Sequence, residues 1–198
     1  MGRKAREERQ ERREDIVAKR SKEKRKTLLM AAGILALISV IVGYSSYVFI
    51  NMDASVPGAP PGAGKLGDEH VHSSLLVRIF GDKFDFAVPS YQIKSSWIHF
   101  EDSDGTTIHR HSSGVTLGYL FDSINIGIDD KCYIFPDGRQ FCTNEDYSLK
   151  YYINHQPVSS INDYIFEDGD RILISFGSET PEQIEEQLFE LDAQIIKG

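Results

Sequence analysis

Five of the six histidines in this chain fall between residues 69 and 111. They are His70, His72, His99, His109 and His111. Imidazole nitrogens are good ligands for zinc and copper, and a carboxylate such as that of Glu101 can join them. Three ligands with an open position would activate a water molecule, whereas four closed ligands would form a structural site. We therefore predict a metal site formed by these five histidines and Glu101.

Three of these histidines belong to one predicted hairpin, WIHFEDSDGTTIHRH, residues 97–111. A loop at 103–105 would join its strands, with Gly105 supplying the positive φ that such loops need. That register places His99 opposite His109. Because side chains alternate along a strand, one face would carry Trp97, His99, Glu101, Thr107, His109 and His111. The other face would enter the core through Ile98, Phe100 and Ile108.

His70 and His72 precede a second predicted hairpin, residues 73–93. A two-residue turn at Gly81 and Asp82 gives three apolar cross-strand pairs. These pairs are Ile79 with Phe84, Val77 with Phe86 and Leu75 with Val88. The same register places His72 opposite Tyr91 and His70 opposite Ile93, on the face away from the core. Two neighbouring ribbons would then supply the metal ligands.

Other interpretations of the histidines remain open. They could be surface residues on a polar sheet face, stacked with Trp97 and Tyr91. They could also sense external pH, because an unperturbed histidine has a pKa of about 6.5. His155 is not included in the site. No nucleophile–base pair, phosphate loop or paired carboxylates stand out in the sequence, so a binding role is favoured over an enzymatic one.

The N-terminal part of the sequence predicts a membrane anchor. Residues 1–26 hold 12 Lys/Arg and 6 Asp/Glu, and residues 27–50 hold no charged residue. A helix over 27–50 would span about 36 Å, enough for a bilayer core of about 30 Å. This run is longer than the apolar core of a cleaved signal peptide. Because excess Lys/Arg marks the cytoplasmic side, we predict a single-pass cell-membrane protein with its N-terminus in the cytoplasm and its C-terminal domain outside.

Composition changes again after the anchor. Residues 51–67, NMDASVPGAPPGAGKLG, are rich in proline and glycine and predict a tether. Residues 68–198 are numerous enough for a single core. The basic segment 1–26 is expected to meet anionic lipid rather than nucleic acid.

The only two cysteines lie in the segment CYIFPDGRQFC. A three-residue loop at 136–138 would place Cys132 directly opposite Cys142, where antiparallel strands approach closely. We predict a structural disulfide, which fits an oxidising compartment. A redox-active pair would require the C-x-x-C spacing, which is not present here.

The remaining pattern predicts two helices and two further strands. Thr116 can cap a short helix with the apolar residues Leu117, Leu120, Phe121 and Ile124. Thr180, Pro181 and Gln183 form the start of a C-terminal helix. Its buried stripe would be Ile184, Leu188, Leu191 and Ile195. The strands are expected at 149–154 and at 171–176, the latter after a turn at 167–170.

This order of elements is similar to the β-grasp, or ubiquitin-like, fold, especially the extracytoplasmic modules of the soluble-ligand-binding type. The resemblance rests on the helix at 116–124, the segment Tyr152-Ile153-Asn154 and the segment YIFEDGDRILIS at 164–175. It covers residues 73–177, with 94–112 as an insertion. It implies an α+β class: a β-grasp-like mixed sheet with one short packed helix, an inserted histidine-rich hairpin and a C-terminal helix, preceded by one transmembrane helix. The fold by itself implies no activity.

The whole chain also resembles single-pass membrane-anchored proteins of ammonia-oxidising archaea. The segments E-H-V-H and H-R-H recur in those proteins around a similar outer domain. The resemblance implies no particular activity. The cell surface of these archaea is rich in copper enzymes, which favours copper as the metal without excluding zinc.

Together these patterns give one leading hypothesis and one alternative. The leading hypothesis is an anchored extracytoplasmic domain that binds copper or zinc, as an accessory or metal-handling subunit of a membrane complex. The alternative is a metal-free β-grasp module that docks another protein or a small ligand. The expected partners are membrane lipid around residues 27–50 and a membrane protein.

Overall fold

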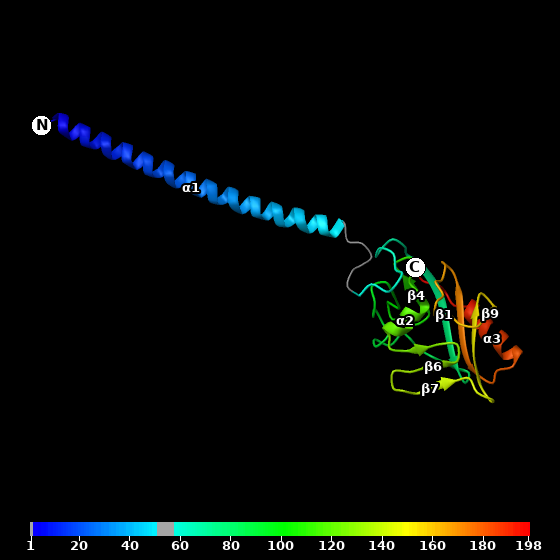
Figure 1. Ribbon diagram of the computed structural model, residues 1–198. Coiled ribbons are helices and arrows are strands. Elements are labelled where there is room, and N and C mark those ends of the chain that lie inside the picture. Colours follow the sequence, from blue (N-terminus) through cyan, green and yellow to red (C-terminus); the bar gives the residue numbers. More distant parts are fainter. Residues whose placement is uncertain (1, 51–57) are drawn as a thin grey trace. The chain divides into compact units, whose positions relative to one another are not determined.

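The computed structural model describes residues 2–50 and 58–198. It divides into two compact units (Figure 1). The first unit is the N-terminal helix α1 (Gly2–Ile50). The second unit is a mixed α+β domain, which contains every predicted metal ligand.

Seven strands form the main sheet of the domain, in the order β3-β4-β1-β10-β8-β9, with β2 paired to one end of β1. The central strands β1 and β10 run parallel, and all other neighbours are antiparallel. The strands are β1 (Val71–Ile79), β2 (Asp82–Lys83), β3 (Ile98–His99), β4 (Thr107–Arg110), β8 (Ser148–Ile153), β9 (Gln156–Val158) and β10 (Arg171–Gly177). The strands predicted at 149–154 and 171–176 are therefore confirmed.

A second, smaller sheet contains the two cysteines. Its strands are β5 (Gly127–Ile128), β6 (Cys132–Ile134) and β7 (Gln140–Cys142). Cys132 faces Cys142 across β6 and β7, and the predicted disulfide joins them. The backbone N–H of Phe135 donates to the carbonyl oxygen of Arg139 at 2.8 Å, which closes the predicted loop.

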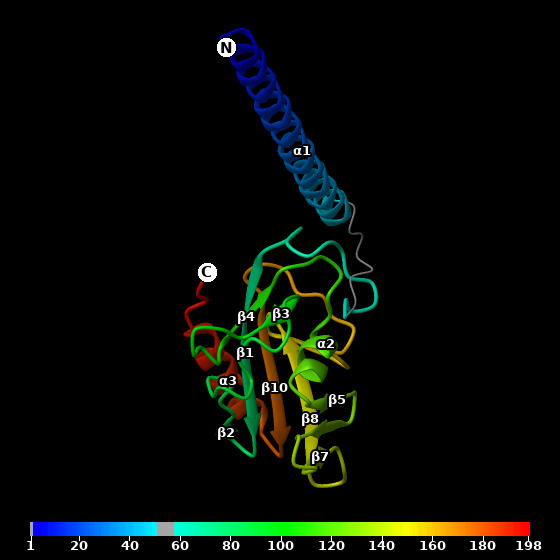
Figure 2. The ribbon, with the colours of Figure 1, turned by 90° about the vertical axis from the view of Figure 1, so that its left-hand side faces the viewer.

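A helix covers each face of the main sheet. Alternate residues of the central strands point to opposite faces and so pack against different helices. Leu75 and Val77 of β1 belong to the larger hydrophobic cluster, on the side of α2 (Leu117–Ser123). Leu76 belongs instead to a smaller cluster with α3 (Pro181–Asp192). Figure 2 shows α2 and α3 on opposite sides of the sheet. His72 has the same parity as Leu76 and therefore lies on the α3 side.

The predicted start of each helix in the domain is confirmed. The Thr116 side chain accepts from the backbone N–H of Tyr119 at the start of α2. Thr180 and Gln183 form the predicted capping box of α3. The predicted fourth member of its buried stripe, Ile195, is wrong: α3 ends at Asp192, and the Ile195 side chain is 79% exposed. Gln187 is buried in the stripe instead.

The predicted turn of the first hairpin is displaced by one residue, and the pairing of its two strands is therefore also wrong. The turn residues are Phe80 and Gly81, both with positive φ, and Ile79 therefore faces Asp82. After Lys83 the chain leaves the sheet, and β4 takes the place beside the first half of β1. As a result, His72 does not face Tyr91. It faces His109.

The loop of the histidine hairpin also differs from prediction in one respect. The positive φ angles are those of Asp102 and Ser103, both 55°, and not that of Gly105. Gly105 is needed for a close approach instead, because a Cβ atom there would lie 2.5 Å from the backbone nitrogen of Ala87.

Part of the predicted tether at 51–67 packs on the domain. Residues 51–57 lie outside the described residues. Further along, Ala59 and Ala63 contact the larger cluster. The backbone N–H groups of Gly64 and Gly67 donate to the carbonyl oxygens of Ser113 and His111, at 2.8 and 2.6 Å.

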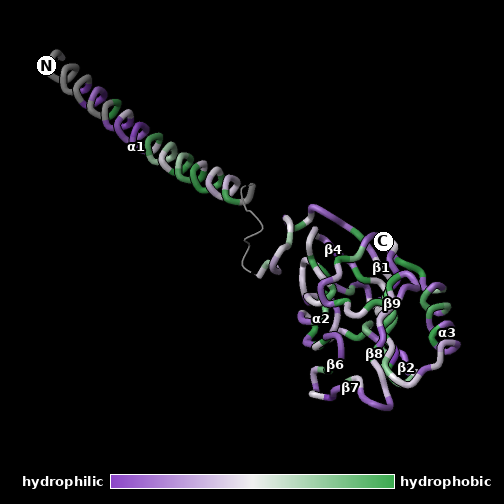
Figure 3. The backbone as a smooth tube through the Cα atoms, turned by 45° about the vertical axis from the view of Figure 1, so that its right-hand side comes forward, coloured by the Kyte–Doolittle hydropathy of each residue, from purple (hydrophilic) through white to green (hydrophobic). Residues whose placement is uncertain are grey.

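The helix α1 changes character along its length. In Figure 3 the part of α1 that is drawn in colour changes from hydrophilic to hydrophobic toward its C-terminal end. The stretch Arg12–Val48 is long and apolar enough to cross a membrane. The prediction of one apolar helix of spanning length is therefore confirmed.

Candidate metal centre

Three neighbouring strands bring the histidines to one face of the main sheet. His99 of β3 lies opposite His109 of β4, as the sequence predicted. His109 in turn lies opposite His72 of β1. His70 lies two residues before His72, and His111 lies two residues after His109. In extended chain such residues point to the same side, so His70 and His111 join His72 and His109 on this face. All five predicted histidines therefore meet.

The rings are in mutual contact. Ring centroids are 4.7 Å apart for His70 and His72, 4.8 Å for His72 and His109, 4.6 Å for His70 and His111, and 4.9 Å for His99 and His111. One nitrogen from each of His70, His72 and His109 lies within 4.8 Å of the others, which is close enough for one metal ion to bind all three. We call the five histidines and Glu101 the histidine cluster.

Burial differs within the histidine cluster. His99 and His109 are only 7% and 6% exposed, His72 and His111 are intermediate, and His70 is exposed. Across residues 2–50 and 58–198, neither Nε2 of His72 nor Nδ1 of His109 has a hydrogen-bond partner, although both atoms are buried. Leaving such an atom unsatisfied costs about 1–3 kcal/mol. A metal ion would compensate that cost.

Electrostatics keep two of the rings neutral. Burial lowers the pKa of His109, and the neighbouring His72, His99 and His111 lower it further against the opposing effect of Glu101. Burial and the nearby His99 and His70 lower the pKa of His111 in the same way. Because a metal ion binds only the neutral imidazole, these shifts favour ligation at neutral pH.

Glu101 lies between two imidazoles. Its Oε2 is 3.1 Å from Nε2 of His99, and its Oε1 is 3.4 Å from Nδ1 of His109. Burial would raise the pKa of Glu101, but the contact with His99 and the proximity of the His109 and His111 imidazoles lower it overall. Glu101 is therefore a carboxylate within reach of a metal ion on this face.

Neighbouring residues fix the strands that carry the ligands. The backbone N–H of His72 donates to Oδ1 of Asp168 at 2.8 Å. Arg110, between His109 and His111, points to the opposite face and donates to the carbonyl oxygens of Ser112 and Phe166, both at 2.8 Å. Arg110 also pairs with Glu69. Glu69, although adjacent to His70 in sequence, is thus engaged away from the histidine cluster.

The chain after α3 returns to the histidine cluster. The backbone N–H of Lys197 donates to Oγ1 of Thr107 at 3.2 Å, and its ammonium group is 3.1 Å from Asp104. Gly198 lies against His72: a Cβ atom there would be 2.8 Å from Cε1 of the ring. No sequence pattern predicts this approach, because it depends on where α3 ends.

Trp97 and His155 lie outside the histidine cluster. Trp97, predicted on the histidine face, instead belongs to the larger hydrophobic cluster, so that expectation is wrong. His155 is 2.9 Å from Asp192, and it takes no part in the histidine cluster, as expected.

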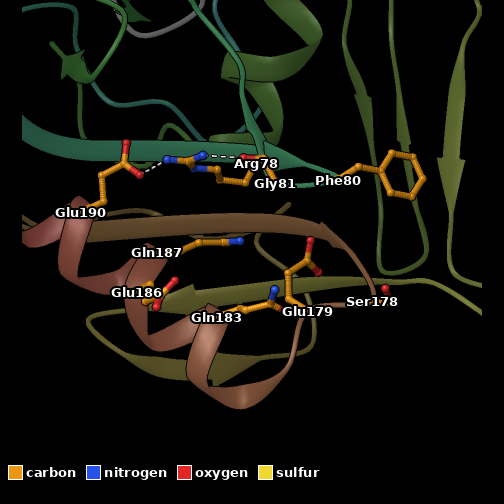
Figure 4. A pocket seen from close by; sticks show the side chains of 9 residues that line it. All are labelled: Arg78, Phe80, Gly81, Ser178, Glu179, Gln183, Glu186, Gln187 and Glu190. Atoms are coloured by element: carbon orange, nitrogen blue, oxygen red, sulfur yellow. Dashed lines mark hydrogen bonds and ion pairs between the residues drawn. The ribbon is translucent and has the colours of Figure 1, made fainter.

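A cavity of about 480 Å³ lies on the same side of the sheet, between β1 and α3 (Figure 4). Two of its three carboxylates are paired: Glu190 with Arg78 of the lining and with Lys83 outside it, and Glu179 with Lys150 outside it at 2.9 Å. Sequence reasoning missed this cavity, because it forms only when α3 docks on the sheet. Its residues are Arg78, Phe80, Gly81, Ser178, Glu179, Gln183, Glu186, Gln187 and Glu190.

Comparison of the chain with protein-family models, with curated proteins and with solved structures gave no match.

Proposed function

We propose that the domain is a transition-metal-binding module that takes copper or zinc at the histidine cluster. The observation that carries this proposal is the convergence of imidazoles from β1, β3 and β4, with nitrogens of His70, His72 and His109 within 4.8 Å of one another. Imidazole-rich sites suit zinc and copper better than magnesium or calcium, which prefer oxygen ligands. The polar supports around Asp168 and Arg110 orient the strands that carry these rings.

The fold proposed for the module is of the β-grasp type. Support comes from the sheet order, in which β1 pairs in parallel with β10, β10 pairs with β8, and β8 pairs with β9. The short helix α2 lies between the first hairpin and β8 in the chain. The insertion at 94–112 supplies β3 and β4, which extend the sheet beside β1. In this proposal the insertion turns a common scaffold into a metal site.

The proposed setting is the outer face of a cell membrane. The apolar stretch within Arg12–Val48 would be the anchor. The excess of Lys/Arg before it supports a cytoplasmic N-terminus, and the disulfide between Cys132 and Cys142 supports an oxidising exterior for the domain. An anchored metal-binding module of this kind would act as an accessory or metal-handling subunit beside a membrane-protein partner.

Metal binding by the full-length protein in detergent tests the proposal. After removal of metal with a chelator, the protein is titrated with Zn²⁺ or Cu²⁺, and bound metal is counted by elemental analysis after gel filtration. The wild type is expected to retain metal with a dissociation constant below micromolar. The double variant His72→Ala with His109→Ala is expected to lose at least 100-fold in affinity.

His155→Ala is the matched control, because it removes the one histidine outside the histidine cluster. It is expected to bind as the wild type does. Binding no tighter than micromolar in the wild type, or equal binding by the double variant, would reject a metal function. A membrane protein that co-purifies equally with both forms after chelation would then favour the metal-free interaction module.

A further inference from the structure

The hydrogen bonds of His99 fix where its lone pair points. Its Nδ1 is 2.7 Å from the carbonyl oxygen of Ser95. A carbonyl oxygen can only accept a hydrogen bond, so Nδ1 carries the ring proton. In the neutral ring, the lone pair is therefore on Nε2. That nitrogen is 3.1 Å from Oε2 of Glu101, which is also an acceptor.

The second oxygen of Glu101 is in a similar position. It lies 3.4 Å from Nδ1 of His109, a buried nitrogen that has no hydrogen-bond partner in the described part of the chain. The carboxylate is thus held between two largely buried imidazoles, whose side chains are 8% and 7% exposed. A cation between Nε2 of His99 and Oε2 of Glu101, either a metal ion or a proton, would offset the charge of this carboxylate.

The spacing of these atoms fits a metal ion. Zinc–nitrogen and zinc–oxygen bonds are about 2.0–2.2 Å long, so two ligands in tetrahedral geometry lie about 3.3–3.5 Å apart. The separation of 3.1 Å between Nε2 of His99 and Oε2 of Glu101 is close to that value, and the other oxygen, Oε1, is 3.4 Å from Nδ1 of His109. The mixed nitrogen and oxygen donors suit Zn²⁺ or Cu²⁺.

This position is different from the one defined by His70, His72 and His109. His99 and Glu101 are absent from that trio. The His99 ring centroid is 6.1 Å from that of His109, and His109 therefore lies between the two positions. The two sets of donors share only this central residue.

From this geometry we propose that the histidine cluster holds two metal ions. The first is bound by His70, His72 and His109, and the second by His99 and Glu101, on the other side of the His109 ring. This inference rests on the proposed metal function and extends it from a single ion to a pair of neighbouring ions. Binding of the second ion uses Nε2 of His99, because Nδ1 is engaged with the Ser95 carbonyl oxygen, and any proton on Nε2 is released to solvent when the ion binds.

Stoichiometry in four forms of the full-length protein tests the inference. Zn²⁺ alone is the first probe and Cu²⁺ alone the second, with bound metal counted per chain. The wild type is expected to hold two ions. Glu101→Gln, which has the same shape without the charge, and His99→Ala are each expected to hold one ion. The variant with His70→Ala and His72→Ala is expected to hold one ion at the other position.

The outcomes separate this inference from the proposed function. One ion per wild-type chain, unaffected in number and affinity by Glu101→Gln, overturns the two-ion inference while the metal function stands. A proton on His99 would then balance Glu101. Complete loss of metal in Glu101→Gln would mean a single site centred on that carboxylate, and it also overturns the inference. No metal in the wild type rejects the proposed function itself.

Discussion

Two polar regions lie on the α3 side of the main sheet, and they differ in how their charges are balanced. In the cavity beside α3, Glu190 meets Arg78 and Lys83, and Glu179 meets Lys150. In the histidine cluster, Glu101 meets only imidazole nitrogens within the described residues. The cavity has a volume of about 480 Å³, and two of its carboxylates, those of Glu179 and Glu190, already have cationic partners. Charge balance is therefore the property that separates the histidine cluster, the proposed metal site, from the ion-paired carboxylates of the cavity.

Metal binding at the histidine cluster should give the largest change in the stability of the domain. Zn²⁺ at 100 to 1,000 times its dissociation constant is expected to stabilise the folded domain by about 3–4 kcal/mol. For a chain of this size the melting temperature should then rise by about 6–16 °C, as measured by thermal unfolding in detergent. The variant with His72→Ala and His109→Ala should show no rise, and the charge-neutralising variant Glu190→Gln should show the full rise. Equal shifts in both variants would place the metal outside the histidine cluster.

Removal of the disulfide tests whether the smaller sheet affects metal binding at the histidine cluster. Replacing Cys132 and Cys142 by alanine removes a bond that closes a short loop, so the loss of stability should be at most about 2–3 kcal/mol. Chemical denaturation measures this loss. Metal affinity should stay within about twofold of the wild type, because no ligand lies on β6 or β7. A tenfold loss of affinity would show that the two sheets are coupled.

Asp104 lies in the same hairpin as Glu101, but its carboxylate has a cationic partner, Lys197, at 3.1 Å. Burial would raise the pKa of Asp104, but hydrogen bonds from Thr106, Lys197 and Thr107 outweigh it and lower the pKa from 3.8 to about 2. A lowered folded-state pKa stabilises the protein above the unfolded pKa, and this contribution is lost as the pH falls from about 4 to 2. It amounts to about 2 kcal/mol. Asp104→Asn should remove that part of the pH dependence.

Unfolding by denaturant at pH 7 and at pH 2.5 measures the effect. The variant should be less stable than the wild type at pH 7, and the difference should shrink at pH 2.5. A constant difference at both pH values would contradict the assigned hydrogen bonds.

The ion pair of the cavity should give the smallest effect. Arg78 and Glu190 are partly exposed, at 24% and 33% for their side chains, so solvent screens their attraction. Glu190→Gln is expected to cost no more than about 1 kcal/mol, and metal stoichiometry should not change. Thermal unfolding and metal analysis of the same sample check both points. A change in bound metal would mean that the cavity and the histidine cluster act together.

Short-range features were the predictable part of the fold. The pairing of His99 with His109 followed from loop length and strand alternation, and it is confirmed. The disulfide and the capping box of α3 followed from equally local patterns. In each case the interacting residues are close in sequence, so few arrangements compete.

Long-range pairing could not be obtained from the sequence. The observed turn at Phe80 and Gly81 pairs Ile79 with Asp82, whereas the predicted turn at Gly81 and Asp82 would pair Ile79 with Phe84, so local apolar pairing favoured the wrong turn. The choice decides that His72 meets His109, 37 residues away in sequence. Likewise, the burial of Trp97 and the exposure of Ile195 depend on how remote elements dock.

The position of Gly198 has a practical consequence for handling the protein. With a virtual Cβ only 2.8 Å from the His72 ring, even an alanine at this residue would displace the imidazole. A polyhistidine tag fused after Gly198 would place additional metal ligands beside the histidine cluster, and the measured metal stoichiometry would then be too high. Purification handles should therefore be attached ahead of α1.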